Sequence, residues 1–247
     1  MAEKTRIDLL LVERGMFASR AAARASIDAG LVKVAGRRID KPSAKVDREA
    51  DIAAEPAHPY VSRGGLKLAH ALDVFGIDPA RYHCADLGAS TGGFTDVLLQ
   101  RGADRIVAID VGRNQLHPNI RRSPKVTAKE QTDIRSVSSE DIDPHIQLLV
   151  ADLSFISLEK ALPTVLDFMS GGTDLVALFK PQFQVGRDYV GKGGIVSNSD
   201  AVKRAKTRFD TWLTDRGWRV LGWSDSPISG GDGNQEYLVH ARKRGGD

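Results

Sequence analysis

The chain has little of what secreted, metal-binding or membrane-spanning proteins need. Cys84 is its one cysteine among 247 residues, so no internal disulfide can form and no cysteine-rich zinc site is available. Charged residues interrupt the apolar residues at the N-terminus, which excludes the unbroken apolar core of a signal peptide. No run of about 18 apolar residues occurs, so we expect no membrane span. These absences favour a folded cytoplasmic protein.

Metal-ligand spacing is also absent from the six histidines. Structural and catalytic zinc sites place His and Cys ligands at short, regular separations, and no such pattern is found here. We therefore expect any catalysis to proceed without a metal ion.

The charge of the chain is unevenly distributed. The net charge is only +3, yet residues 1–45 carry ten Lys/Arg against five Asp/Glu, and the remainder has a slight excess of acids. This asymmetry indicates a basic module that faces a polyanion, joined to a nearly neutral body.

The basic module shows a helix–helix–hairpin pattern. Apolar residues at helical spacing predict a helix over residues 6–15. Ser19 is a typical N-cap for a second helix over residues 19–30. A strand pattern follows over residues 31–39, with a turn at Gly36. Arginines that share one face of the second helix could simply be solvated, which is the plain alternative to a binding role.

This pattern resembles the S4 domain, a small RNA-binding domain named after a ribosomal protein. The resemblance rests on the skeleton RG...SR..A......G.V.V.G....KP and covers about 45 residues. It implies binding to structured RNA, through phosphate contacts made by basic side chains. The candidate phosphate contacts are Arg6, Arg14, Arg20, Arg24, Arg37, Arg38 and Lys41.

Two domains are expected. The segment AEPAHPY, residues 54–60, contains two prolines and little periodicity, which is typical of a linker. We place the RNA-binding domain at residues 1–58, the linker at 59–62 and the second domain at 63–247.

In the second domain, β-type runs alternate with helical patterns. This order predicts an open α/β, Rossmann-like sheet of seven strands with helices on both faces, where ligands bind at the carboxyl ends of strands. The strands are expected at residues 82–88, 105–110, 125–130, 147–152, 174–180, 218–223 and 236–242. The helices are expected at residues 63–75, 92–101, 157–169 and 200–216.

The first two of these strands end in a nucleoside-binding pattern. A glycine-rich turn follows the first strand, and Asp110 ends the second, where an acid can accept hydrogen bonds from ribose hydroxyls. The spacing G-x-x-x-G-G differs from the dinucleotide fingerprint, so S-adenosylmethionine fits better than a dinucleotide. Asp133 could accept from an adenine amino group or merely form a local turn. The candidate cofactor contacts are Asp86, Gly88, Ser90, Thr91, Gly92, Gly93, Phe94, Asp110, Val111, Asp133 and Asp152.

Four charged residues are placed where the site of such a sheet would lie. Asp152 and Lys180 end strands, Glu236 opens the last strand, and Lys67 lies on the apolar stripe of a helix. Each has a plain structural alternative, as a cap, a strand end, an edge charge or a lysine that reaches solvent. Three strand ends and one helix converge on one cleft in this fold, which favours a shared catalytic role.

The second domain contains six long motifs, YVSRGGLKL, DLGASTGGFTDVLL, AIDVG, VADLSFISL, FKPQF.VG and SPISGGDGNQEYL. Together they are similar to those of the TlyA family of haemolysin-like ribosomal RNA methyltransferases, relatives of the FtsJ-type 2'-O-methyltransferases. The resemblance implies a class I methyltransferase fold and a catalytic tetrad of Lys67, Asp152, Lys180 and Glu236. It also implies S-adenosylmethionine as methyl donor and the 2'-hydroxyl of a ribosomal RNA cytidine as acceptor. Shorter members are implied to modify large-subunit RNA, so we expect that substrate.

Methyl transfer to a hydroxyl requires alignment and removal of the hydroxyl proton. A free lysine has a pKa of about 10.4, and burial beside a second cation makes a lysine a better base at neutral pH. We therefore predict that Lys180, beside Lys67, is the base, and that Asp152 and Glu236 hold the two ammonium groups.

A glycine-rich loop follows Lys180 and is expected to cover the site. Arg187 and Lys192 on this loop, together with Arg63 before the first helix, are further candidates for RNA contacts. The sequence departs from the family pattern at Gln184, where Glu is usual, and at Gln131 and Asp133, where Arg and Asn are usual.

Two other functions compete with this one. The protein could be a ribosome-assembly factor that binds RNA with an idle tetrad, or a haemolysin, as the family's older name suggests. The second conflicts with the absence of an amphipathic basic helix or membrane span. We expect a monomer that acts on ribosomal RNA or a ribosomal subunit, and a target cytidine that flips out of its stack.

Overall fold

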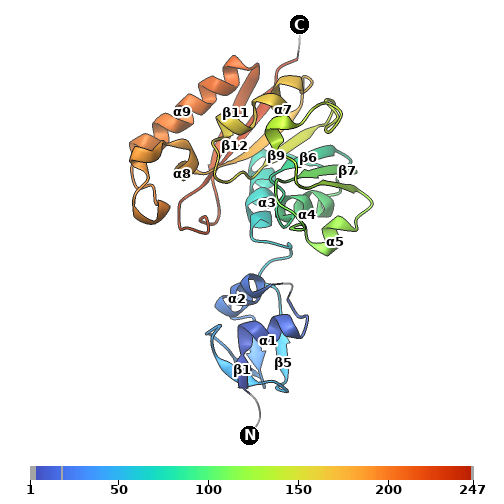
Figure 1. Cartoon of the computed structure of the whole chain (residues 1–247), viewed down its shortest axis with the longest axis vertical. Coiled ribbons are helices and arrows are strands. Elements are labelled where there is room, and N and C mark those ends of the chain that lie inside the picture. Colours follow the sequence, from blue (N-terminus) through green and yellow to red (C-terminus); the bar gives the residue numbers. More distant parts are fainter. Residues whose placement is uncertain (1–3, 18, 246–247) are drawn as a thin grey trace. The chain divides into compact units, whose positions relative to one another are not determined.

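A computed structural model describes residues 4–17 and 19–245 and divides into two compact units, Met1–Pro59 and Tyr60–Asp247 (Figure 1). Each unit has its own hydrophobic core. The two units are therefore described separately.

The N-terminal unit packs two short helices on two small antiparallel sheets. Ser19 caps the second helix as expected, because its side chain accepts the N–H of Ala22. The strand pattern over residues 31–39 is a hairpin whose inner strand also pairs with residues 52–54, so the expected linker at 54–60 overlaps the last strand. The elements are β1 Lys4–Arg6, α1 Ile7–Glu13, α2 Arg20–Asp28, β2 Val32–Val34, β3 Arg37–Arg38, β4 Lys45–Asp47 and β5 Ile52–Ala54.

The second unit contains the expected seven-stranded sheet, in the order β11-β12-β10-β9-β6-β7-β8. Neighbouring strands from β8 through β10 are parallel, whereas β12 runs antiparallel to both β10 and β11. The strands are β6 His83–Leu87, β7 Arg105–Ile109, β8 Val126–Lys129, β9 Leu148–Ala151, β10 Asp174–Phe179, β11 Trp218–Asp225 and β12 Tyr237–Lys243.

Alternation along the strands divides the core into two layers, one on each face of the sheet. Leu148 and Val150 of β9 face one layer with helices α3 and α4, whereas Leu149 and Ala151 face the other with α6, α7 and α9. Both faces are therefore covered, as predicted (Figure 1). The helices are α3 Gly64–Phe75, α4 Gly93–Gln100, α5 Pro118–Arg121, α6 Leu158–Ala161, α7 Pro163–Phe168, α8 Pro181–Gln184 and α9 Ser199–Asp215, with 3-10 turns Ile134–Ser136, Arg187–Tyr189 and Lys192–Gly194.

The prediction of a single helix over residues 157–169 was wrong. The segment forms two short helices, α6 and α7, which meet at Leu162. Pro163 opens the second helix because proline has no N–H to donate within a continuous helix and its ring fixes φ for a first turn.

Among the described residues, no helix combines the length and the apolar character that crossing a membrane requires.

Candidate active site

Four charged side chains emerge from the sheet on the face that carries α3. The core residues Val150, Val176 and Leu238 all lie on this face. Side chains alternate along a strand, and Asp152, Lys180 and Glu236 each lie an even number of positions, two or four, from one of these core residues. They therefore project from the same face of the sheet. Asp86 does so at the end of β6, where its carboxylate contacts α4 through Thr95. The fold thus aligns acids and a lysine in one row.

Two ion pairs organise this row. The Lys67 ammonium of α3 donates to Glu236, and the two side chains are only 10% and 3% exposed. The Lys180 ammonium lies 2.5 Å from Asp152 Oδ1 and donates to Ser154 Oγ at 2.9 Å. Each lysine therefore has its own carboxylate, as the sequence predicts for charge balance.

Strand register brings the two pairs together. Phe179 of β10 pairs with Tyr237 of β12, so Lys180 and Glu236, the next residue on each side, occupy adjacent positions across the antiparallel ladder. The start of α3 also lies against Asp152, since a Cβ added at Gly64 would be 3.9 Å from Asp152 Oδ2. All four predicted catalytic residues thus lie at one end of the sheet.

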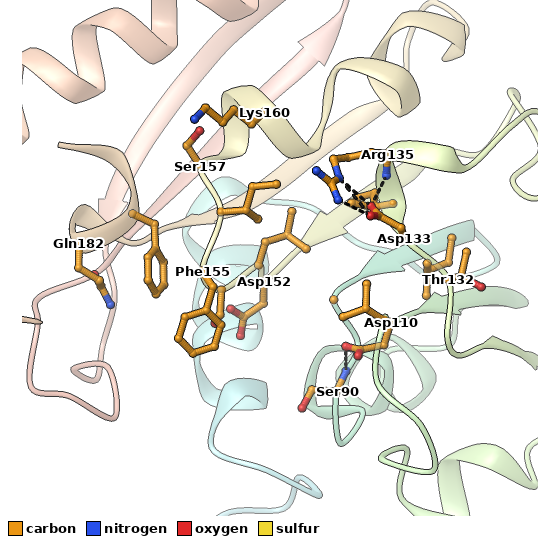
Figure 2. A pocket seen from close by; sticks show the side chains of 18 of the residues that line it. Ser90, Asp110, Thr132, Asp133, Arg135, Asp152, Phe155, Ser157, Lys160 and Gln182 are labelled. Carbon is orange, nitrogen blue, oxygen red and sulfur yellow. Dashed lines mark hydrogen bonds and ion pairs between the residues drawn. The ribbon is translucent and has the colours of Figure 1, made fainter. Parts of the chain in front are cut away.

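A pocket of about 890 Å³ opens at this end of the sheet (Figure 2). This volume is in the range of small-molecule and cofactor sites. Six of the predicted cofactor residues line it, namely Gly88, Ser90, Asp110, Val111, Asp133 and Asp152.

Gly88 shows why the turn after β6 requires glycine. Its φ is +86°, and an added Cβ would lie 2.5 Å from the carbonyl oxygen of Asp152. Either condition excludes other residues without a shift of the backbone. The turn therefore approaches the end of β9 closely and leaves a backbone-lined cradle.

Asp110 lies at the end of β7, on the same side of the pocket as Ser90 (Figure 2). It accepts the N–H of Ser90 at 2.8 Å and that of Gly112 at 2.6 Å. A carboxylate has about four lone-pair sites, so about two remain for further donors. This geometry suits the two hydroxyls of a ribose.

The other five predicted cofactor residues do not line the pocket. Phe94, in the first turn of α4, has its side chain buried in the core, and Gly93 is in close contact with α3, where an added Cβ would lie 3.0 Å from Gly65 N. Gly92 precedes α4 with a φ of +92°. Thr91 is exposed, and Asp86 is fully buried. These residues shape the turn instead of facing the cavity.

Asp86 keeps one carboxylate oxygen, Oδ1, buried without a hydrogen-bond partner, while Thr95 Oγ1 donates to the other at 2.6 Å. Burial raises the pKa of Asp86 to about 7, with the hydrogen bond from Thr95 opposing the shift and the charges of Asp152 and Asp110 reinforcing it. Because the pKa of Asp86 is higher in the folded state, this carboxyl keeps its proton at pH values at which the unfolded chain has already lost it.

We expect Asp86→Asn to change the pH dependence of stability. In the wild type, the contribution of Asp86 is fully present below about pH 4 and is lost as the pH rises toward 7. The variant cannot ionise, so its stability relative to wild type should rise over this range by up to about 4 kcal/mol. Urea unfolding at a series of pH values measures the difference, and a difference that is constant with pH would contradict the assignment.

Asp133 lines the pocket, but its carboxylate is engaged locally. Its Oδ1 accepts the N–H of Arg135 at 2.9 Å, and the Arg135 guanidinium donates to both oxygens (Figure 2). The local turn, which was the alternative to adenine binding for Asp133, is therefore present. Arg135 holds the pKa of Asp133 down, at about 2, so this side chain remains an acceptor at neutral pH.

Several pocket residues were not predicted from the sequence. Ser154 follows Asp152 and orients Lys180, and Gln182 and Phe183 extend the pocket wall from α8. Phe155 is 92% exposed, has a φ of +65° and lies 5.5 Å from the ring of Phe183. A bulky residue with positive φ is a genuine outlier, so the surrounding structure must hold Phe155 in this conformation. Ser154 and Phe155 belong to the motif VADLSFISL, but the periodicity of the sequence assigns no role to either side chain.

The basic residues of the N-terminal unit divide into two groups. Arg6 makes two hydrogen bonds of 2.9 Å to the fully buried Asp8, and Arg20 adds one of 2.8 Å. These hydrogen bonds hold the pKa of Asp8 well below its usual range, and the bond from Arg6 has the largest effect. Arg14 donates to backbone carbonyls near residue 50, and Arg38 pairs with Asp40 at 2.6 Å. The remaining candidates, whose side chains are exposed, are Arg24, Arg37 and Lys41 in this unit and Arg63, Arg187 and Lys192 in the other.

The loop after α8 is fastened to the segment that precedes Glu236. The buried Asn234 accepts the N–H of Val196 and donates to the carbonyl of Gly194, both at 2.9 Å. Gln184 is also buried and accepts the N–H of Leu158 at 3.2 Å. An amide therefore supports this loop contact where the family usually has a carboxylate.

No cluster of three or more His, Cys, Asp or Glu is arranged to hold a metal ion within residues 4–17 and 19–245.

The sheet order, the glycine turn and the pocket at the strand ends define a Rossmann-like methyltransferase. Residues 60–243 match the FtsJ-like methyltransferase family, and residues 5–52 match the S4 domain. The structure of the N-methyltransferase NodS from Bradyrhizobium japonicum shares the fold, with a TM-score of 0.51 at 17% identity over 73% of this chain and 94% of that one.

More similar relatives span nearly the whole chain. The 16S/23S rRNA (cytidine-2'-O)-methyltransferase TlyA of Mycobacterium tuberculosis is 42% identical over 98% of this chain and 91% of its own length. A solved Streptococcus thermophilus structure with a haemolysin name is 40% identical, with a TM-score of 0.77 over 99% of this chain and 90% of that one. The chain therefore belongs to the TlyA family of FtsJ-like methyltransferases.

Proposed function

We propose that the protein transfers a methyl group from S-adenosylmethionine to the ribose 2'-hydroxyl of a cytidine in ribosomal RNA. The observation that carries the proposal is the paired arrangement of Lys67 with Glu236 and of Lys180 with Asp152, beside a pocket that suits an adenosyl cofactor. The substrate class is supported by the M. tuberculosis relative, whose name specifies ribosomal RNA cytidine.

The pocket residues fit S-adenosylmethionine. The backbone cradle at Gly88 allows a ligand to approach closely, and Asp110 retains acceptor capacity toward a ribose. When bound, the cofactor supplies the methyl group.

The paired residues then prepare the acceptor. Lys180 Nζ, held by Asp152 and Ser154, would act as the base in its neutral amine form. It would take the proton of the 2'-hydroxyl as the oxygen–carbon bond forms and the carbon–sulfur bond of the donor breaks, which leaves a neutral thioether. Lys67, fixed by Glu236, donates a hydrogen bond to the same oxygen and keeps it in line. Direct displacement at carbon requires no group other than these for proton transfer.

Asp110→Ala should weaken cofactor binding. Loss of one charged acceptor for the ribose hydroxyls, together with the Ser90 and Gly112 contacts, is worth about 1–3 kcal/mol, or roughly 5- to 150-fold in Kd. Calorimetry with S-adenosylmethionine measures the change. The control is Asp215→Ala, an exposed acid at the end of α9, and equal affinities for the two variants would refute the assignment.

Phe155→Ala should weaken RNA turnover and leave cofactor binding unchanged. An aromatic ring that is 92% exposed at the pocket edge can stack on a flipped base, which is worth about 1–3 kcal/mol per base. We expect kcat/KM for RNA to fall roughly 5- to 150-fold. The matched control is Leu221→Ala, an exposed apolar residue on β11; a similar fall in both would remove the stacking role.

The proposal is tested by incubating the protein with methyl-labelled S-adenosylmethionine and, separately, small and large ribosomal subunits that lack the modification. Label in the RNA of one or both subunits supports it and identifies the subunit. Absence of label from both, although S-adenosylmethionine and RNA bind, would instead favour the assembly-factor function.

A further inference from the structure

We propose that Glu130 is a positioning residue that holds the cofactor side of the pocket in its binding conformation without contacting the cofactor. This inference rests on the proposed use of S-adenosylmethionine. Glu130 directly follows β8, and it is not among the residues that line the pocket.

The Glu130 carboxylate accepts hydrogen bonds from three consecutive backbone N–H groups. It accepts from Asn114 at 2.9 Å, Gln115 at 2.8 Å and Leu116 at 3.1 Å. It also forms an ion pair with Arg121 of α5, and its side chain is only 13% exposed. One side chain therefore fixes the whole turn between β7 and α5.

Residues at the end of that turn contact the glycine-rich turn after β6. The N–H of His117 donates to the carbonyl of Thr91 at 3.1 Å. Leu116 packs on Gly92, where an added Cβ would lie 2.9 Å from its Cδ1 atom. Gln115, whose N–H is one of the three that donate to Glu130, lines the pocket. Displacement of the 114–116 turn would thus move both a pocket wall and its glycine turn.

The segment after Glu130 is joined to Asp110 as well. The N–H of Thr132 donates to the Asp110 carbonyl at 3.0 Å, and that of Gln131 donates to the Gly112 carbonyl at 2.9 Å. Asn114 and Gln131 have φ values of +53° and +56°, a region that is uncommon for residues other than glycine, although asparagine adopts it more often than most. The hydrogen bond from the Asn114 N–H to Glu130 holds the first of these two positions in place.

A carboxylate is required at this position, and an amide would not replace it. Three converging N–H donors need acceptor lone pairs, whereas the NH₂ group of glutamine would place a fourth donor among them. The hydrogen bond from Arg121, followed by those of the three backbone groups, lowers the pKa of Glu130 to about 2. The group is therefore an acceptor at any physiological pH.

The test compares the full-length wild type with Glu130→Gln, Arg121→Gln and Glu140→Gln. Glu140 is an exposed acid in the same domain and serves as the matched control. We expect Glu130→Gln to raise the Kd for S-adenosylmethionine at least tenfold, while kcat at saturating cofactor and KM for RNA stay within about threefold. Arg121→Gln retains the three backbone bonds, so its Kd should change less than threefold, as should that of Glu140→Gln.

A merely structural role predicts a different outcome. A lower Tm for Glu130→Gln with an unchanged Kd on the folded protein, or a fall in kcat at saturating cofactor with an unchanged Kd, would overturn the inference. If Glu130→Gln does not fold, Glu130→Asp takes its place: its shorter carboxylate should raise the Kd, and a wild-type Kd would contradict the role. If the wild type itself fails to bind S-adenosylmethionine, the proposed function fails instead.

Discussion

Replacing Lys180 with methionine should abolish methyl transfer while leaving the fold and cofactor binding intact. The side-chain nitrogen at this position is held by Asp152 and Ser154 at the end of β10, where its neutral amine form can take the proton of the attacking hydroxyl. Loss of a positioned base costs about 10²- to 10⁴-fold in rate. Methionine preserves the length and the apolar stem of the side chain, so packing around Phe179 should persist.

The measurement is the single-turnover rate with saturating RNA and S-adenosylmethionine. Lys203→Met, which removes an exposed lysine of α9, is the matched control and should react at the wild-type rate. Retention of more than one tenth of the wild-type rate by Lys180→Met would show that another group removes the proton.

Replacing Glu236 with alanine should impair both stability and activity. The change leaves the Lys67 ammonium, only 10% exposed, without its carboxylate. Breaking a buried ion pair by removing one partner costs about 3–5 kcal/mol. For a chain of this size, that loss corresponds to a fall of roughly 6–20 °C in Tm. The RNA methylation rate should fall with it, because Lys67 loses its fixed position.

A double variant separates the two effects. In Lys67→Met/Glu236→Leu both charges are replaced by apolar groups of similar size, a change that is often neutral or stabilising for a buried pair. We expect the Tm to recover most of the loss while activity stays absent. Thermal unfolding and the methylation assay report on the two quantities separately. A Tm for Glu236→Ala equal to that of wild type would argue against a buried pair.

The sequence predicted the elements that obey a simple period. The expected strand boundaries placed Asp152 and Lys180 at the carboxyl ends of two strands, and in the structure they directly follow β9 and β10. Lys67 was singled out because it shares a helical stripe with apolar residues, and it is indeed buried. Period and spacing, however, do not specify which carboxylate each lysine meets. That pairing depends on how α3 packs across β12.

Residues on irregular segments could not be predicted in the same way. Ser154 and Glu130 directly precede two residues of positive φ, Phe155 and Gln131, whose conformation no periodicity determines. The pairing of Arg6 and Arg20 with Asp8 joins the β1–α1 junction to a second helix, a contact that only the folded domain defines. The break at Pro163 differs, since a proline inside a predicted helix is itself a signal to divide it.

Nucleoside analysis of the methylated RNA tests the proposed chemistry most directly. After reaction with labelled S-adenosylmethionine, ribosomal RNA from wild-type and Lys180→Met reactions is digested to nucleosides and separated by mass. We predict labelled 2'-O-methylcytidine from the wild type and none from the variant. Label on a base, or on the ribose of another nucleoside, would contradict the assignment of this cleft to cytidine 2'-O-methylation.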